Sequence, residues 1–242
     1  MTYYTVLASD YDGTLAKDGA VDDSTLHALE RWRQAGRQLV LITGRKFEDL
    51  FQICSCLPLF NWVVAENGAM LYEPATQREK LLGDRPSESF IQQLRERVHA
   101  AAQREQTAVS DEMQQVQTQY SLVSHGRIIV STWEPHSIEA KALIEELGLD
   151  IQIILNKGAV MLLPIGVDKA AGIKAVAREL ATPLDAFVGV GDAENDLPFL
   201  QCCGYSVAVA NALPEVKTQV SAVTQAERGA GVTELIEQLL LS

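Results

Sequence analysis

The chain has 242 residues, of which 47% are hydrophobic and 21% charged, and its formal net charge is −12. This length and composition suit a soluble globular protein with one large domain or two smaller ones. The acidic balance disfavours non-specific binding to nucleic acid or to anionic membranes. No apolar run reaches the roughly 18 residues of a membrane helix, and no signal peptide is evident at the N-terminus. We therefore expect neither a nucleic-acid nor a membrane partner.

The cysteines give a weak indication of compartment. None of the four has a common zinc-site spacing, and we interpret them as reduced thiols (Cys54, Cys56, Cys202 and Cys203). Reduced thiols favour a cytoplasmic location. The sequence does not distinguish a monomer from a homodimer.

The first seventy residues alternate between predicted strands and helices. Apolar runs predict strands at 4–9, 38–42 and 62–65. Apolar residues at helical spacing predict a helix at 24–35, with Ser24 as its N-cap, and another that begins near Phe47. This alternation is typical of a parallel sheet with crossover helices.

From about residue 73 the pattern changes. It predicts a charged helix at 87–104 and strands at 116–122 and 127–133. A second helix follows at 140–147 and a hairpin at 151–163. Strand pairs with a helix between them indicate an α+β layer with one solvated face.

The parallel pattern returns after Asp168, with predicted helices at 173–180 and 232–240 and strands at 186–190 and 205–209. We therefore expect an α/β fold. Its Rossmann-like parallel-sheet core would be formed by residues 1–72 and 166–242. An α+β domain at 73–165 would be inserted into this core.

Four segments place polar residues directly after a predicted strand or at the start of the next helix. They are Asp10-Tyr11-Asp12-Gly13-Thr14, Thr43-Gly44-Arg45, Lys169, and Gly191-Asp192-Ala193-Glu194-Asn195-Asp196. Because the carboxyl ends of parallel strands lie side by side, these segments would form one cluster of carboxylates, a lysine and a hydroxyl. Those groups fit phosphoryl transfer at an oxygen-ligated Mg2+ site.

These segments resemble the four ordered motifs of the haloacid dehalogenase superfamily of phosphatases. The resemblance covers residues 5–70 and 165–240, and the insert lies between the second and third motifs. Asn67-Gly68-Ala69 and the segment from Pro164 to Lys169 are similar to the large α/β-cap subclass. That subclass includes the Cof-type sugar phosphatases and the sucrose-phosphate phosphatases. The resemblance implies Mg2+-dependent hydrolysis of a small phosphorylated metabolite, either a sugar phosphate or a phosphorylated short acid.

The resemblance also implies roles for the catalytic residues. Asp10 would be the nucleophile that forms an aspartyl-phosphate. Asp12 would protonate the leaving alcohol and then activate the attacking water. Thr43 would hydrogen-bond a phosphate oxygen, and Lys169 would neutralise charge on the transferring group.

Further residues would hold the metal and the substrate. Asp192 would ligate Mg2+ together with Asp10 and the backbone carbonyl of Asp12, and Asp196 would orient a water on the metal. The remaining candidates would contact the substrate: Thr14, Gly44, Asn67, Asn156, Lys157 and Asn195.

Several of these residues also have a purely structural interpretation. Thr43 could cap a helix that begins at Arg45, and Arg45 itself is left outside the catalytic set. Lys169 could be a solvated residue in the first turn of a helix. Asp196 could be the N-cap of the helix that follows it, in addition to any role at the metal.

The insert should determine the substrate, because contacts to the leaving group must come from outside the phosphate site. Its hairpin tip, Asn156-Lys157-Gly158, offers an amide, a cation and open backbone, although the same residues could simply form the turn. Residues 160–163 read Val-Met-Leu-Leu, where many Cof-type members carry a Glu before the proline. The resemblance therefore does not extend to a hexose-phosphate preference.

Two further functions stay open besides hydrolysis. Phosphomannomutases are similar in both motifs and cap, so a phosphomutase would return the phosphate to a bound hexose phosphate. An inactive phosphate-binding regulatory module is the other alternative. The intact motifs argue against it, because a binding module has no need for both Asp10 and Asp12.

Overall fold

The computed structural model describes residues 4–106 and 122–241. Contacts divide the chain into two units, one formed by Met1–Leu82 with Val167–Ser242 and the other by Gly83–Gly166. The strand expected at 116–122 lies outside the described residues, except for Leu122.

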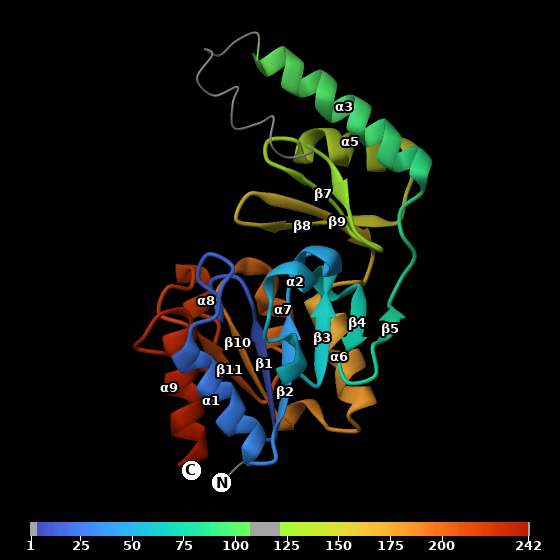
Figure 1. Ribbon diagram of the computed structural model, residues 1–242. Coiled ribbons are helices and arrows are strands. Elements are labelled where there is room, and N and C mark those ends of the chain that lie inside the picture. Colours follow the sequence, from blue (N-terminus) through green and yellow to red (C-terminus); the bar gives the residue numbers. More distant parts are fainter. Residues whose placement is uncertain (1–3, 107–121, 242) are drawn as a thin grey trace. The chain divides into compact units, whose positions relative to one another are not determined.

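The first unit is built on an eight-stranded sheet in the order β12-β11-β10-β1-β2-β3-β4-β5 (Figure 1). The six strands from β12 to β3 are parallel, and β4 and β5 continue the sheet antiparallel. The strands are β1 (Val6–Asp10), β2 (Gln38–Ile42), β3 (Trp62–Ala65), β4 (Met70–Glu73), β5 (Arg78–Leu81), β10 (Phe187–Gly191), β11 (Tyr205–Ala208) and β12 (Ala222–Val223).

Helices cover both faces of this sheet. Helices α1 and α9 pack together on one face, and α6 and α7 lie on the other (Figure 1). The helices are α1 (Asp23–Gln34), α2 (Phe47–Ile53), α6 (Lys169–Glu179), α7 (Leu197–Leu200), α8 (Pro214–Lys217) and α9 (Arg228–Leu240). A mainly parallel sheet enclosed by helices confirms the predicted α/β fold.

The central strands are buried on both faces, which explains their sequences. Every residue of β1, β3 and β10 is buried, so apolar residues run continuously instead of alternating. The N-cap of α1 differs from the expectation. Asp22 caps this helix by accepting from the Thr25 backbone N–H at 2.9 Å, and Ser24 lies inside the first turn. The expectation that Ser24 caps the helix was therefore wrong.

The structural division of the chain differs from the expected limit at residue 73. That residue ends β4, and β5 pairs with β4 from Met70↔Leu81 to Glu73↔Arg78. The first unit consequently continues to Leu82. Because all four residues of β5 are exposed and three are charged, the hydrophobic pattern gave no sign of this edge strand.

The second unit has an antiparallel sheet in the order β6-β7-β9-β8. Its elements are α3 (Glu88–Gln106), β6 (Ser124–His125), β7 (Val130–Trp133), α5 (Ser137–Leu147), β8 (Ile151–Asn156) and β9 (Ala159–Pro164). Residues from both helices and from β7 and β9 form a separate hydrophobic core, which includes Phe90, Leu94, Leu143 and Leu162. The hairpin expected between 151 and 163 is present as β8 and β9.

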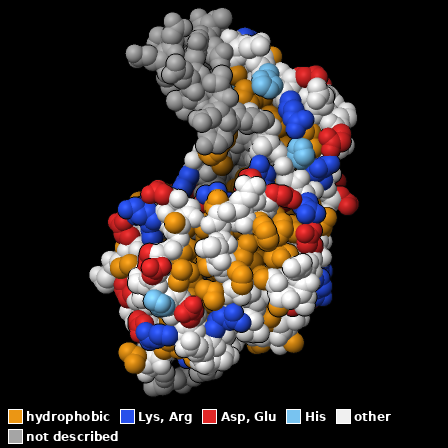
Figure 2. Space-filling model, in the orientation of Figure 1, with side chains coloured by type: hydrophobic (Ala, Val, Ile, Leu, Met, Phe, Trp, Pro, Cys, Tyr) orange, Lys and Arg blue, Asp and Glu red, His pale blue; other side chains and the backbone are white. Residues whose placement is uncertain are grey.

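Two further observations concern membrane-spanning helices and surface charge. No helix among the described residues combines the length and the apolar character needed to cross a membrane. On the side shown in Figure 2, basic and acidic side chains are interspersed over the described residues.

The turn after β3 packs directly against the start of α6. Glu66, Asn67 and Gly68 all have positive φ, of 53°, 54° and 105°. A Cβ atom on Gly68 would lie 1.8 Å from the backbone oxygen of Asp168. Gly68 therefore allows this turn to reach the backbone that carries Lys169.

We predict that Gly68→Ala destabilises the protein by about 3 kcal/mol, because left-handed strain of about 1–2 kcal/mol adds to overpacking against the backbone. Gly36→Ala is the matched control. Its φ is +77° but no atom lies within 4 Å of its Cβ position, so it should cost only about 1 kcal/mol. Chemical denaturation followed by circular dichroism measures both. Equal losses would show that the close approach to Asp168 is unimportant.

Candidate active site

The motif residues meet where the direction of the sheet connections reverses. From β1, the chain proceeds to β2 and β3 on one side, while β10, β11 and β12 lie on the other. Ser9 pairs with Val190, and Asp10 pairs with Ile42, so the ends of β1, β2 and β10 lie side by side. Such a switch point is the usual ligand site of open α/β sheets.

A buried lysine connects two of these strand ends. The Lys169 ammonium donates to Asp10 Oδ1 at 2.6 Å and to Asp196 Oδ1 at 2.5 Å. Only 1% of the Lys169 side chain is exposed, which excludes the solvated-lysine interpretation. Asp168 caps α6 by accepting from the Ala171 backbone N–H, which fixes the first turn that carries Lys169.

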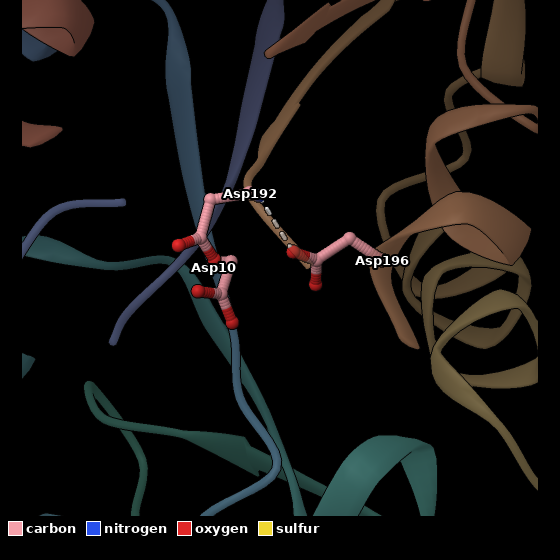
Figure 3. Close-up of side chains that lie close together, drawn as sticks. All are labelled: Asp10, Asp192 and Asp196. Atoms are coloured by element: carbon pink, nitrogen blue, oxygen red, sulfur yellow. Dashed lines mark hydrogen bonds between the residues drawn. The ribbon is translucent and has the colours of Figure 1, made fainter. Parts of the chain in front are cut away.

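Asp196 organises the loop that follows β10. Its Oδ2 accepts from the backbone N–H groups of Asp192 and Ala193 at 2.8 and 2.9 Å. Figure 3 shows the hydrogen bond from the Asp192 backbone to Asp196, and it shows the Asp10 and Asp192 carboxylates beside each other. Although Asp196 precedes α7, its side chain makes no capping bond to that helix. Its carboxylate instead connects Lys169 with the Asp192 backbone.

Burial and like charge both act on Asp10. Burial is the larger influence and raises its pKa well above the usual range, and Asp196 and Asp192 raise it further, against the opposing effect of Lys169. Burial also acts to lower the pKa of Lys169, but Asp10 and Asp196 outweigh it and raise that pKa. The lysine therefore stays protonated, and the acidic side chains around it outnumber this one cation.

This charge excess tests whether the site fits a metal ion. Asp10, Asp192 and Asp196 each offer an oxygen, and these atoms lie within 4.8 Å of one another. If all three acids are ionised, they and the one ammonium leave two negative charges, which a divalent cation would balance. Ligands that are all oxygen suit a hard cation such as Mg2+. The residues present fit such an ion, although both Asp196 oxygens already accept hydrogen bonds.

Asp12 lies near this cluster but faces a different cation. Arg45 donates from Nε to Asp12 Oδ2 at 2.6 Å and from Nη2 to Oδ1 at 2.7 Å. The side chains are 35% exposed for Arg45 and 43% for Asp12. Asp12 therefore does not join the carboxylate group of Asp10, Asp192 and Asp196 through its side chain.

The loops after β2 and β3 are linked to the loop after β10. Thr43 is buried, and its Oγ1 accepts from the Arg45 backbone N–H at 3.1 Å. Helix α2 begins at Phe47, with Lys46 as N-cap, so Thr43 does not cap it. Asn67 donates from its backbone to the Thr43 carbonyl, and Asn195 Nδ2 donates to Asn67 Oδ1 at 2.9 Å. The Asn67 and Asn195 side chains therefore contact each other.

The other candidate substrate residues are distributed over both units. Thr14 is fully buried in the loop after β1, and Gly44 lies between Thr43 and Arg45. Asn156 and Lys157 lie in the second unit, at the end of β8 and in the turn that follows. Lys157 has a positive φ of 47°, so its backbone adopts the left-handed conformation of a tight turn.

Sequence reasoning missed two residues that contact the loop after β1. Arg45 was left outside the set, although it follows Thr43 closely enough to reach the same loop. Asn211 donates from Nδ2 to the Gly13 carbonyl at 2.8 Å and accepts from the Arg228 backbone N–H at 2.8 Å. No motif pointed to Asn211, because both contacts are far away in the sequence.

Comparison with known families gives one match that covers most of the chain. The family described as haloacid dehalogenase-like hydrolase matches residues 7–142 and 103–236. Both matched ranges together include all of the site residues described above.

Individual relatives and solved structures agree with this match. The chain is 28% identical to a phosphoglycolate phosphatase from Natronomonas pharaonis, over 96% of each chain. It is 30% identical to a phosphoglycolate phosphatase from Haloarcula marismortui, over 95% of each. Its fold is similar to that of the subclass IIB sugar phosphatase BT4131, with a TM-score of 0.70, 18% identity, and coverage of 98% of this chain and 100% of the other.

We predict that Lys169→Met destabilises the metal-free protein by about 3–5 kcal/mol, because it leaves Asp10 and Asp196 buried without their cation. Lys174→Met, on an exposed position of the same helix, is the matched control and should be nearly neutral. Chemical denaturation in the presence of a chelator measures both variants. A similar stability for the two variants would contradict the proposed electrostatic role of Lys169.

Proposed function

We propose that this chain, which belongs to the haloacid dehalogenase-like hydrolases and is a phosphatase of that family, hydrolyses a small phosphate monoester through an aspartyl-phosphate on Asp10. The observation that carries the proposal is the buried Lys169 contact at the switch point of the sheet, which fixes the Asp10 carboxylate beside Asp192.

Asp10 is the nucleophile in this proposal. Lys169 contacts Oδ1 and so orients the carboxylate, while the other oxygen can approach phosphorus. Attack forms the Asp10–phosphate bond and breaks the bond from phosphorus to the leaving oxygen. Water then attacks phosphorus, which releases inorganic phosphate and restores the Asp10 carboxylate.

Asp12 transfers the protons. It follows Asp10 by two residues and is partly exposed, so it can reach the leaving oxygen without joining the nucleophile's buried cluster. It gives a proton to the leaving alcohol in the first step and takes one from water in the second. Before it does so, at least one of its oxygens must leave Arg45.

Other residues hold the phosphoryl group. Thr43 Oγ1 accepts from a backbone N–H, which orients its own hydroxyl proton toward a phosphate oxygen. Lys169 offsets negative charge on the transferring group. We propose that Asn67 and Asn195 hold the surrounding loops through their mutual hydrogen bond, and that Thr14 and Gly44 contact phosphate.

Asp10, Asp192 and the backbone carbonyl of Asp12 would hold Mg2+. When bound, the ion would offset the charge of the carboxylates and of the phosphate. Asp196 stabilises the positions of these residues, because its oxygens accept hydrogen bonds from Lys169 and from the backbone N–H groups of Asp192 and Ala193.

The substrate in this proposal is a small phosphorylated metabolite, and both a phosphorylated short acid and a sugar phosphate belong to that class. Relatives named phosphoglycolate phosphatase support the first, and the fold similarity to a sugar phosphatase is compatible with the second. We propose that residues 83–166 act as a cap that reads the leaving group, with Asn156 and Lys157 at its hairpin, and that the protein acts in the cytoplasm.

We predict that Asp10→Asn lowers phosphate release from p-nitrophenyl phosphate by about 10³-fold or more, because an amide is a very poor nucleophile. Acid quenching of the wild-type reaction followed by peptide mass spectrometry should locate phosphate on Asp10. Asp185→Asn is the control, because it changes an exposed carboxylate near the start of β10, at the other end of that strand. Near wild-type turnover by Asp10→Asn would rule out the covalent route.

A further inference from the structure

Hydrogen bonds hold the backbone of Arg45 in place beside the proposed phosphate site. Its backbone N–H donates to Thr43 Oγ1 at 3.1 Å, and its carbonyl accepts from the Glu66 N–H at 2.9 Å. The loops after β2 and β3 therefore hold its backbone from both sides. Arg45 is two residues after Thr43, whose hydroxyl we propose to contact phosphate.

The guanidinium contacts a carboxylate with two parallel hydrogen bonds. Nε and Nη2 each donate to a different oxygen of Asp12, at 2.6 and 2.7 Å. This fork suits a planar anion with two oxygens, and a neutral hydroxyl cannot fill it. The contact with Asp12 therefore indicates that the Arg45 guanidinium is placed to bind a carboxylate.

This contact lies where water can reach it. Both side chains are more than a third exposed, so water or another anion can replace Asp12 on the guanidinium when the pair separates. While the pair is intact, both Asp12 oxygens accept hydrogen bonds from Arg45, which holds the carboxylate toward the guanidinium. In the proposed reaction at least one Asp12 oxygen turns from Arg45 to the leaving group, and this frees donors of the fork beside that group.

We infer that the leaving group of the substrate carries a carboxylate, and that Arg45 binds it in the place that Asp12 vacates. This inference rests on the proposed function and adds the chemical class of the substrate, a phosphorylated short carboxylic acid. In a chain of net charge −12, a second anionic group on the substrate needs a cation of its own. Lys169 is engaged by Asp10 and Asp196, whereas Arg45 is accessible and always charged.

The test compares two esters that differ only in this group. 2-Phosphoglycolate carries a carboxylate where 2-hydroxyethyl phosphate carries a hydroxymethyl group. We would measure kcat/KM for both with wild type, Arg45→Gln, Arg45→Lys and the neighbouring control Lys46→Gln. Thermal unfolding of each variant verifies that it is folded.

We expect wild type to prefer 2-phosphoglycolate by about 10-fold or more. Arg45→Gln should lower kcat/KM for that ester by about 10- to 100-fold, the loss of two charge-assisted hydrogen bonds, and should change the neutral ester by less than about 3-fold. Arg45→Lys should lie between Arg45→Gln and wild type, because it keeps the charge but lacks the fork. Lys46→Gln should leave the preference unchanged.

Equal losses on both esters in Arg45→Gln would overturn the inference, because Arg45 would then act only on Asp12. A wild type without preference for the carboxylate, or an Arg45→Gln without effect, would also overturn it. Turnover of p-nitrophenyl phosphate separates this failure from failure of the proposed function. If wild type cleaves that ester but not 2-phosphoglycolate, only the inference fails; if it cleaves none of the three, both fail.

Discussion

The Lys169 ammonium lies between the carboxylates of Asp10 and Asp196, where almost no water can screen their charges. Each of the three groups would be costly to bury without the others. Their mutual attraction joins β1, the start of α6 and the loop after β10 at one point. The same contact orients Asp10 and, through Asp196, fixes the backbone of Asp192. Because three acids still face one lysine, the site has an excess of negative charge that suits a divalent cation and disfavours an empty, fully ionised state.

The sheet topology creates the place for this contact. Connections run outward from β1 in both directions, so no crossover covers the ends of β1 and β10. Close backbone approach completes the arrangement. Gly68 lets the turn after β3 touch Asp168, which caps α6 and precedes Lys169 directly. Packing of the core and geometry of the site therefore depend on the same few residues, and changes at Gly68 should affect both.

Much of the core could be predicted from the sequence, because its physical signals are local. Continuous apolar runs predict strands at 38–42 and 62–65, and β2 and β3 have these same bounds in the structure. Because the carboxyl ends of parallel strands lie at one edge of a sheet, the motif residues that follow such strands could be expected to lie close together. The exposed, charged strand β5 carried no such signal, and its pairing depends on β4. The Arg45–Asp12 fork and the Asn211 contact to Gly13 depend on tertiary structure that joins distant segments, so local patterns could not reveal them.

The buried acidic side chains outnumber their lysine, and we propose that they bind one divalent ion through Asp10 and Asp192. Calorimetric titration of Mg2+ into metal-free protein measures this binding in wild type, Asp192→Asn and Asp12→Asn. We predict one ion per chain in wild type and a loss of binding in Asp192→Asn. Binding should be retained in Asp12→Asn, because that side chain faces Arg45. No binding by wild type, or equal binding by wild type and Asp192→Asn, would show that these carboxylates do not form the metal site.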